Sequence, residues 1–192
     1  MNLVTGHGIV TEAELTYTGS GLAILNLAID AGKTQYVTAF GGTAEKLSTS
    51  KGMHLSWWGR ISSNVYTTKD GRETWHMKLR LVEGEAGQIP QTVVKQTMGM
   101  FAGEVAQEQV KDRDQVKQIN TMRFHYEKQN GVTENYLVQL EDNAPQGQAS
   151  GELEYRTFEH NGLHIRTFLV RNNANVPNVE PVAAGSDASP WN

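Results

Sequence analysis

Hydrophobic and polar residues alternate along the first half of the chain in short runs that predict β-strands. Over residues 34–40, Val37 and Ala39 share one face. The opposite face carries Tyr36, Thr38 and Phe40. Residues 22–29, just before, form a dense apolar run that is short enough for a buried strand. We therefore expect two neighbouring strands, the second of which exposes aromatic rings.

The same alternation recurs over residues 75–82, where it separates apolar from basic side chains. One face carries Trp75, Met77, Leu79 and Leu81, and the other carries His76, Lys78 and Arg80. The dipeptide Asp70-Gly71 precedes this run, and a glycine after aspartate tolerates the positive φ that tight hairpin turns need. The run is therefore predicted to be the second strand of a hairpin that presents cations on one side.

The remaining elements of the first 84 residues complete one small β-domain. We expect strands over 2–10 and 54–61, and a short helix over 43–49 with Thr43 as its N-cap. The order is three strands, a helix and two strands. This is the order of the five-stranded Greek-key barrel called the oligonucleotide/oligosaccharide-binding fold, or OB-fold. The predicted fold class is all-β, with residues 1–84 as an N-terminal OB-fold domain.

A similar plan recurs in the second half, after a segment over 85–99 that has no steady period and that we interpret as a linker. Residues 100–171 are predicted to form a second OB-like domain in tandem with the first. The alternative is a single barrel followed by an unrelated β-rich extension. Matching glycines are almost evenly spaced: 92 positions separate Gly59 from Gly151, and 91 separate Gly71 from Gly162.

Residues 172–192 have low hydrophobicity and no periodicity, which predicts a disordered C-terminal tail. Trp191 is an unusual residue in such a segment, because no core is available there to bury its ring.

The charge balance does not indicate a protein that binds duplex DNA or anionic membranes. The 192 residues include 17 Lys+Arg and 21 Asp+Glu, for a formal net charge of −4, whereas such binders are usually basic. Single-strand binding stays open, because base stacking needs no charge. The chain has no cysteine, no apolar run of about 18 residues and no secretory signal at its start. We expect a cytoplasmic protein, in the bacterial cytoplasm or nucleoid or in a phage-infected host.

Motifs of common enzyme classes are absent from the sequence. It lacks a phosphate-binding Gly-x-x-x-x-Gly-Lys-Ser/Thr loop, a His-Glu-x-x-His zinc motif and a Gly-x-Ser-x-Gly nucleophile motif. His160 and His164 are four residues apart, but Asn161-Gly162 places them on opposite arms of a hairpin. We expect no catalytic activity, no cofactor and no metal site.

Aromatic and basic side chains on exposed strand faces are the candidates for a binding site. A ring can stack on an unpaired base, and a neighbouring cation can contact the phosphate backbone. The candidates in the first half are Tyr36, Phe40, Trp58, Arg60, Tyr66, His76, Lys78 and Arg80. Those in the second half are Tyr155, Arg156, Phe158 and Arg166.

Several candidates also have an ordinary structural explanation. Phe40 would lie in the core if the strand register were shifted by one residue, and Tyr36 could belong to a protein interface. Trp58 could stack on a base or contact another subunit. Lys78 and Arg80 could simply form a solvated charged face.

Short motifs of the first half stand in an order and at a spacing that are typical of one family. The segments are Ala13-Glu-Leu-Thr-Tyr-Thr-Gly-Ser-Gly21 and Phe40-Gly-Gly-Thr-Ala-Glu-Lys-Leu47, with Asn26 between them and Lys51-Gly52, Gly59-Arg60 and Asp70-Gly71 after them. They resemble the bacterial and phage single-stranded DNA-binding protein family, whose corresponding segments are Pro-Glu-Leu-Arg-Tyr-Thr-x-x-Gly and Phe-Gly-Lys-x-Ala-Glu-x-Leu. The resemblance covers about 85 residues, and the second half matches only as a topology.

The resemblance implies an OB-fold that wraps single-stranded DNA by stacking and phosphate contacts. Phe40 falls on a base-stacking aromatic of the family, and Tyr66 falls on the position of a stacking tryptophan in the long hairpin. Thr34 replaces another family tryptophan, and the shortened loop over 31–33 has no counterpart for a further aromatic. These two losses imply a shorter or weaker site on the first barrel, with Tyr36 as a possible replacement.

The resemblance also implies partners. Family members end in an acidic tip closing in Pro-Phe that recruits replication and repair proteins, and Asp187, Pro190 and Trp191 resemble that tip. Tandem-barrel members form dimers with four barrels, so we expect a homodimer here.

These expectations describe a non-catalytic protein that binds single-stranded DNA largely without sequence specificity and protects it in DNA replication, recombination and repair. The alternative function is an OB-fold interaction or scaffold module that docks on a replication or recombination protein.

Overall fold

The computed structural model describes residues 1–127, 131–141 and 147–171. The first half forms a barrel in which strands pair in the order β1–β2–β3–β5–β4, and β4 pairs back onto β1. All of these pairs are antiparallel except β3–β5, which is parallel. This is the connectivity of an OB-fold. The elements are β1 (Asn2–Tyr17), β2 (Ala23–Asp30), β3 (Thr34–Phe40), α1 (Gly41–Leu47), β4 (His54–Thr67) and β5 (Glu73–Gly87).

The second half repeats the same connectivity. Its elements are β6 (Gln96–Ala102), β7 (Glu104–Asp112), β8 (Gln115–Glu127), β9 (Thr133–Leu140), β10 (Gln148–His160) and β11 (Leu163–Arg171). Strands pair in the order β7–β8–β9–β11–β10, with β9–β11 parallel, and β10 closes the barrel onto β6 and β7. The pair β6 and β7 therefore takes the place of β1. The predicted tandem of OB barrels is confirmed, and the alternative of an unrelated extension is wrong.

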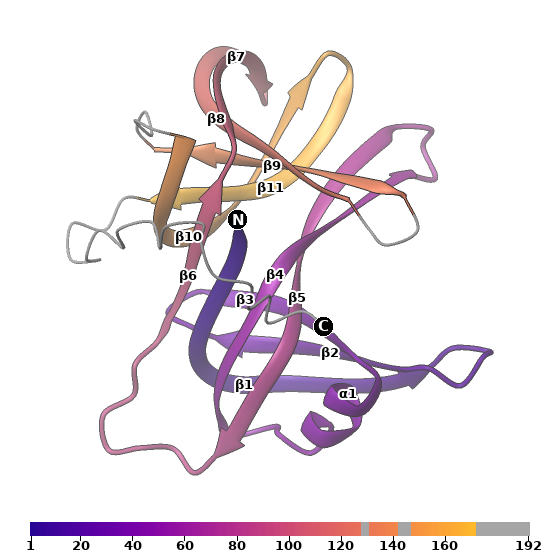
Figure 1. The fold of residues 1–192 in the computed structure, drawn as a ribbon, viewed down its shortest axis with the longest axis vertical. Helices are drawn as coiled ribbons and strands as arrows, with labels where there is room; N and C mark the ends of the chain where they lie inside the picture. The colour runs from indigo at the N-terminus through magenta and orange to yellow at the C-terminus, as the bar shows by residue number, and fades with distance from the viewer. Residues whose placement is uncertain (128–130, 142–146, 172–192) are drawn as a thin grey trace.

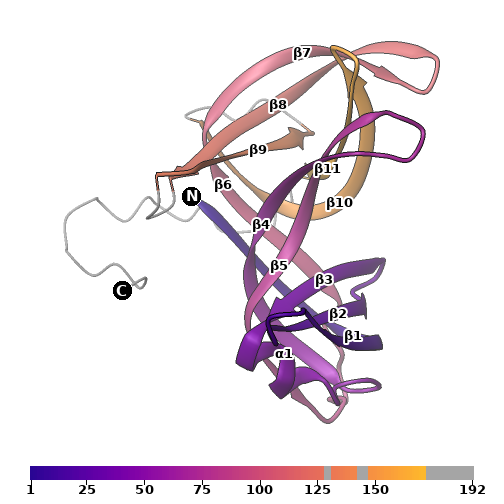
Figure 2. The ribbon, with the colours of Figure 1, turned by 90° about the vertical axis from the view of Figure 1, so that its right-hand side faces the viewer.

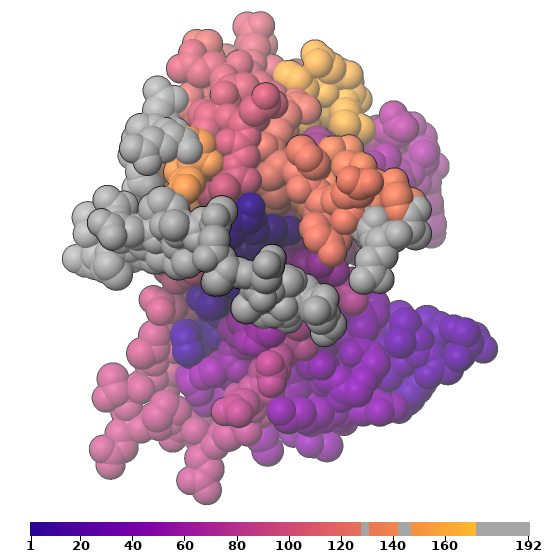
Figure 3. Space-filling model, viewed as in Figure 1, coloured from indigo at the N-terminus to yellow at the C-terminus, as the bar shows by residue number. Residues whose placement is uncertain are grey.

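The two barrels are joined by continuous strand pairing. Strand β1 pairs antiparallel with β6 from Asn2↔Phe101 to His7↔Gln96, and β5 pairs in parallel with β11 from His164↔Thr74 to Arg166↔His76. As a result the β4–β5 hairpin of the first barrel lies alongside the β10–β11 hairpin of the second (Figures 1 and 2). In the space-filling view these hairpins are the purple and yellow segments at the upper right (Figure 3).

Two sequence-based boundaries differ from the structure. The expected linker over 85–99 is shorter, because β5 extends to Gly87 and β6 begins at Gln96. The helix begins at Gly41, with Phe40 in the N-cap position, so the prediction of Thr43 as N-cap is wrong. The hydroxyl of Thr43 is engaged elsewhere, since its Oγ1 donates a hydrogen bond to the carbonyl oxygen of Val82, 3.1 Å away.

The core follows the predicted alternation in the first barrel, where Val37, Ala39, Met77, Leu79 and Leu81 are buried. In the second barrel three rings stack in a row: Phe101 on Phe124 at 5.4 Å between centroids, and Phe124 on Tyr136 at 5.1 Å. Burial of these apolar side chains is the main stabilising contribution.

The expected disordered tail over 172–192, with Asp187, Pro190 and Trp191, lies outside the described residues. In the part of the chain that the structure describes, no helix is both long and apolar enough to cross a membrane.

Candidate nucleic-acid interface

The outer face of β3 exposes the aromatic residues that its alternation predicts. Tyr36 is 74% exposed, whereas Val37 and Ala39 on the opposite face are buried. Phe40 lies partly exposed on the Tyr36 side at the end of the strand. The shifted register that would place Phe40 in the core is therefore excluded.

Cations from β5 and β4 lie beside these rings. Strand β5 pairs with β3 at Thr38↔Arg80 and with β4 at Arg60↔Arg80 and Ser62↔Lys78. Because side chains alternate along strands, Lys78 and Arg80 share the outer face with Arg60. The carbon Cζ of Arg80 lies 4.8 Å from the centroid of the Phe40 ring, which is a cation–π contact. Phe40, Arg80 and Arg60 therefore form one continuous surface across three strands.

This surface continues onto the second barrel through a residue that the sequence analysis missed. The Cζ of Arg60 lies 5.6 Å from the ring centroid of Tyr126 on β8, and the Tyr126 side chain is 46% exposed. Tyr126 lies near the end of a strand whose sequence gives no indication that it faces the first barrel. Only the packing of β9, the strand paired with β8, against β4 brings the two residues together.

A bulge fixes the positions of these cations. The register of β4 against β5 shifts between Trp58 and Gly59. A Cβ on Gly59 would lie 2.0 Å from the carbonyl oxygen of Arg80, so only glycine allows the two strands to approach this closely. The close approach places Arg60 directly opposite Arg80. Burial and the charge of Arg60 lower the pKa of Arg80, although a guanidinium stays charged in proteins.

A second cluster forms where the barrels meet, and it combines candidates from both halves of the chain. The ring of His76 lies 6.4 Å from that of Tyr66 and 6.2 Å from that of Tyr155. The Nε2 of His76 also lies within hydrogen-bond distance, 3.2 Å, of the Tyr155 hydroxyl. Arg166 pairs with His76 in the β5–β11 ladder. The four residues Tyr66, His76, Tyr155 and Arg166 therefore share one place in the fold.

The two barrels differ in how their cations are compensated. Among the described residues, no carboxylate lies within ion-pair distance of Arg60, Lys78, Arg80 or Arg166. On the second barrel, by contrast, Glu154 forms ion pairs with Arg171 at 2.6 Å and Arg156 at 2.8 Å. The first barrel and the junction therefore carry the cations that are available for an anionic ligand.

Phe158 and Arg156 lie away from this surface, whereas Trp58 lies beside Arg60. Phe158 is only 4% exposed and belongs to the core, so its interpretation as an outward ring is wrong. The reason is that the buried face of β10 changes along the strand: Leu153 is buried on one side, whereas nearer the hairpin Thr157 is exposed and Phe158, on the other side, joins the core that includes Val110 of β7. Trp58 donates a hydrogen bond from Nε1 to Glu83 and lines a hollow that also includes Arg60.

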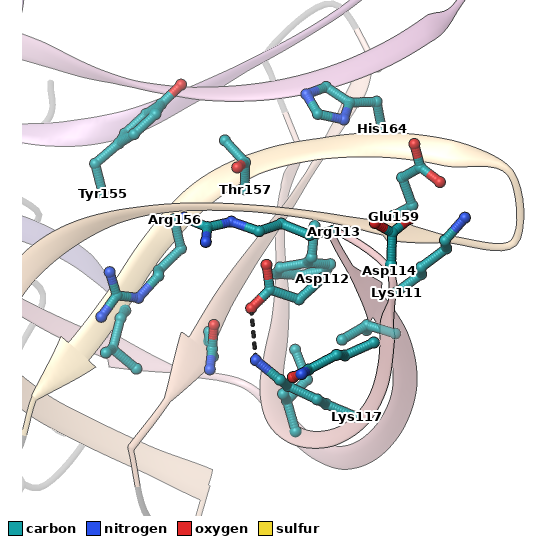
Figure 4. A pocket seen from close by; sticks show the side chains of 16 residues that line it. Lys111, Asp112, Arg113, Asp114, Lys117, Tyr155, Arg156, Thr157, Glu159 and His164 are labelled. Atoms are coloured by element: carbon teal, nitrogen blue, oxygen red, sulfur yellow. Dashed lines mark hydrogen bonds and ion pairs between the residues drawn. The ribbon is translucent and has the colours of Figure 1, made fainter.

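Arg156 lines a different cavity, of about 960 Å³, between the β7–β8 and β10–β11 hairpins. Figure 4 shows Tyr155 and His164 pointing from β10–β11 toward the β4–β5 ribbons, whereas Asp112 and Lys117 lie on the other side of β10. Lys117 forms an ion pair with Asp112 at 2.9 Å. Positive and negative groups alternate around this cavity, so it lacks the uniform charge of the Arg60–Arg80 surface.

The chemistry available at this surface is binding by rings and cations. In the described part of the chain, no three His, Asp or Glu side chains gather closely enough to hold a metal ion. The exposed rings offer π-faces, and the guanidiniums offer forked donors that match phosphate oxygens.

Comparison with known proteins identifies the fold. No protein-family model matches the chain, and no curated protein matches it. The wild-type single-stranded DNA binding protein from Thermus aquaticus aligns over 96% of this chain and 97% of its own, with 18% sequence identity and a TM-score of 0.59. A deletion mutant of that protein aligns over 94% and 98%, with 17% identity and a TM-score of 0.60. This likeness shows that the chain shares the all-β OB-fold of those structures.

Proposed function

We propose that this protein binds single-stranded DNA largely without sequence specificity. The observation that carries the proposal is a row of exposed and partly exposed side chains along β3, β5 and β4. In this row Arg80 and Arg60 have no carboxylate within ion-pair distance among the described residues. Phe40 and Tyr36 present their rings beside these cations. Rings of this kind stack on any base, and the cations contact phosphates. Sequence preference is therefore weak.

An unpaired strand fits this surface better than a duplex. Bases in a duplex are stacked on each other and cannot lie on the rings of Tyr36 and Phe40, whereas unpaired bases can. The net charge of −4 also disfavours non-specific duplex binding, which depends almost entirely on positive charge. The fold is shared with proteins named as single-stranded DNA binding proteins, which supports the same ligand class.

The proposal includes the cellular role and the assembly. The protein protects unpaired strands during replication, recombination and repair in the cytoplasm, and it works as a homodimer with four barrels. The tail residues Asp187, Pro190 and Trp191 contact replication and repair proteins. The resemblance of the sequence to the single-stranded DNA-binding family supports these points.

The test is a titration of the full chain with fluorescently labelled oligothymidine at increasing salt. We expect the logarithm of the affinity to fall linearly with the logarithm of the salt concentration. The slope should be about −0.7 for each phosphate that the protein contacts. The double variant Tyr36→Ala, Phe40→Ala should lose roughly 5- to 100-fold per stacked base. Tyr17→Ala, which removes an exposed tyrosine outside this surface, is the matched control and should bind normally.

Two results would contradict the proposal. Full affinity in the double variant would exclude stacking by β3, and an affinity independent of salt would exclude phosphate contacts. If the wild-type protein does not bind oligothymidine, the alternative of a scaffold module docking on another protein is favoured.

A further inference from the structure

Arg60 and Arg80 form an unusual pair, because two like charges lie directly opposite each other on neighbouring strands. Like charges in that position repel and destabilise a sheet. Both side chains are partly buried, which weakens the screening of this repulsion by water. No carboxylate among the described residues forms an ion pair with either guanidinium. The charge of Glu134 offsets part of the repulsion at Arg80. The two arginines are still neighbouring cations without an ion pair in the described part of the chain, and an anion between them would lower their repulsion further.

Each of these two cations is flanked by a ring, and the two rings belong to different barrels. Phe40 of the first barrel lies 4.8 Å from Cζ of Arg80, and Tyr126 of the second lies 5.6 Å from Cζ of Arg60. The order across the surface is ring, cation, cation, ring. An anion between the arginines would therefore have a flat aromatic surface on either side, one on each barrel.

A hollow opens beside Tyr126. Its volume is about 520 Å³, which lies within the range of small-molecule pockets. Aromatic rings line much of it: Phe124 and Tyr136 are buried, and Tyr126 is partly exposed. The hydroxyl of Tyr136 donates a hydrogen bond to Glu134, so this ring keeps a fixed position. Met1 also lines this hollow.

We propose that the Tyr126 hollow receives one unpaired base, whose neighbouring phosphate lies between Arg60 and Arg80. This inference rests on the proposed function and adds a site to it. The ligand class is a nucleotide within a single strand: its base lies against the Tyr126 ring, and its phosphate oxygens accept hydrogen bonds from both guanidiniums. The next base on the other side of that phosphate stacks on Phe40. A single strand thus passes from the first barrel to the second at this point.

The first experiment compares Tyr126→Ala with Tyr17→Ala in the full chain, with labelled oligothymidine as the probe. Both tyrosines are exposed, at 46% and 59%, so neither substitution should unfold the protein, and thermal unfolding verifies this. We expect Tyr126→Ala to lose roughly 5- to 100-fold in affinity and Tyr17→Ala to stay at the wild-type value. Wild-type affinity in Tyr126→Ala would overturn the proposal that the hollow receives a base, but it would leave the proposed function standing. Failure of the wild-type protein to bind would overturn the proposed function as well.

The second experiment tests whether the two arginines share one phosphate. The salt slope, which is the slope of log affinity against log salt concentration, is measured for Arg60→Gln, for Arg80→Gln and for the double variant. If both contact the same phosphate, the double variant should lose only about 0.7 from the slope, which is the value for one phosphate on a single strand. A loss of about 1.4 from the slope of the double variant would mean that the two arginines contact two separate phosphates, which would overturn the shared site. Lys51→Gln, in an exposed turn after α1, is the control and should keep the wild-type slope.

Discussion

His76 on β5 and Tyr155 on β10 contact each other across the junction between the barrels. The Nε2 of His76 lies 3.2 Å from the Tyr155 hydroxyl, and the two rings meet edge to face at 72°. These residues are 79 positions apart in the chain. The contact is possible because β5 and β11 pair in parallel, which brings the β4–β5 and β10–β11 hairpins together.

This junction should make stability depend on pH. Burial, followed by the charges of Lys78 and Arg166, lowers the pKa of His76 to about 4 from its usual 6.5. On acidification the unfolded chain takes up the proton first, so the free energy of unfolding should fall as the pH drops from about 6.5 to about 4. His76→Gln removes this proton uptake. The thermal unfolding temperature of the variant should therefore decline less than that of the wild-type protein over the same pH range. An equal decline in both proteins would show that His76 is not responsible.

Much of the first-barrel surface could be predicted from sequence because period-two alternation assigns each side chain to a face. Once Val37 and Ala39 are placed in the core, Tyr36 and Phe40 must face outward, and the structure places them there. The same logic holds for Lys78 and Arg80 on β5. A regular strand with one buried face leaves no other register.

Contacts between residues on different barrels cannot be predicted from the alternation within one strand. Tyr126 gains its role from Arg60, which is on a different barrel, and nothing in the local pattern connects them. The interpretation of Phe158 is wrong because the buried face of β10 changes along the strand, so a single alternation does not assign core and surface over its whole length. Leu153 and Phe158 are both buried, although a regular strand would point them to opposite faces.

The corrected position of Phe158 gives a prediction about stability. Phe158→Ala should lower the free energy of unfolding by about 3–5 kcal/mol, because it leaves a cavity in the core of the second barrel. Tyr155→Ala, on the same strand but partly exposed, should have a smaller effect. Urea unfolding followed by circular dichroism measures both. A Phe158→Ala protein as stable as the wild type would contradict the core assignment.

Gly59 and Gly42 should respond in opposite ways to the same substitution. A Cβ at Gly59 would lie 2.0 Å from the Arg80 carbonyl oxygen, so Gly59→Ala must push the strands apart and should destabilise the barrel by roughly 1–3 kcal/mol. Gly42 is in α1, and a Cβ there would meet no atom within 4 Å. Gly42→Ala should therefore stabilise the protein by about 0.5–1 kcal/mol. Thermal unfolding of the two variants side by side gives the comparison, and a change of the same sign in both would contradict it.

Glu154 should limit the affinity of the second barrel for DNA. Its carboxylate forms ion pairs with Lys33 at 3.1 Å, Arg156 at 2.8 Å and Arg171 at 2.6 Å. Glu154→Gln releases three cations that a phosphate could then contact. We expect the affinity for oligothymidine at low salt to rise several-fold and the salt slope to become steeper. The matched control is Glu152→Gln, which removes the same charge from an exposed position two residues away.

The same substitution should reveal what Glu154 contributes to folding. Burial opposes ionisation, but hydrogen bonds from Arg171 and Lys33 and the charge of Arg156 outweigh it and lower the pKa of Glu154 to about 2. A carboxylate with a lowered pKa stabilises the fold above its usual pKa of 4.5, and this stabilisation is lost as the pH falls toward 2. Glu154→Gln should therefore be less stable than the wild type by about 1–2 kcal/mol at neutral pH. The difference should shrink below about pH 4.5, and a constant difference down to about pH 2 would show that packing, rather than charge, is the contribution of Glu154.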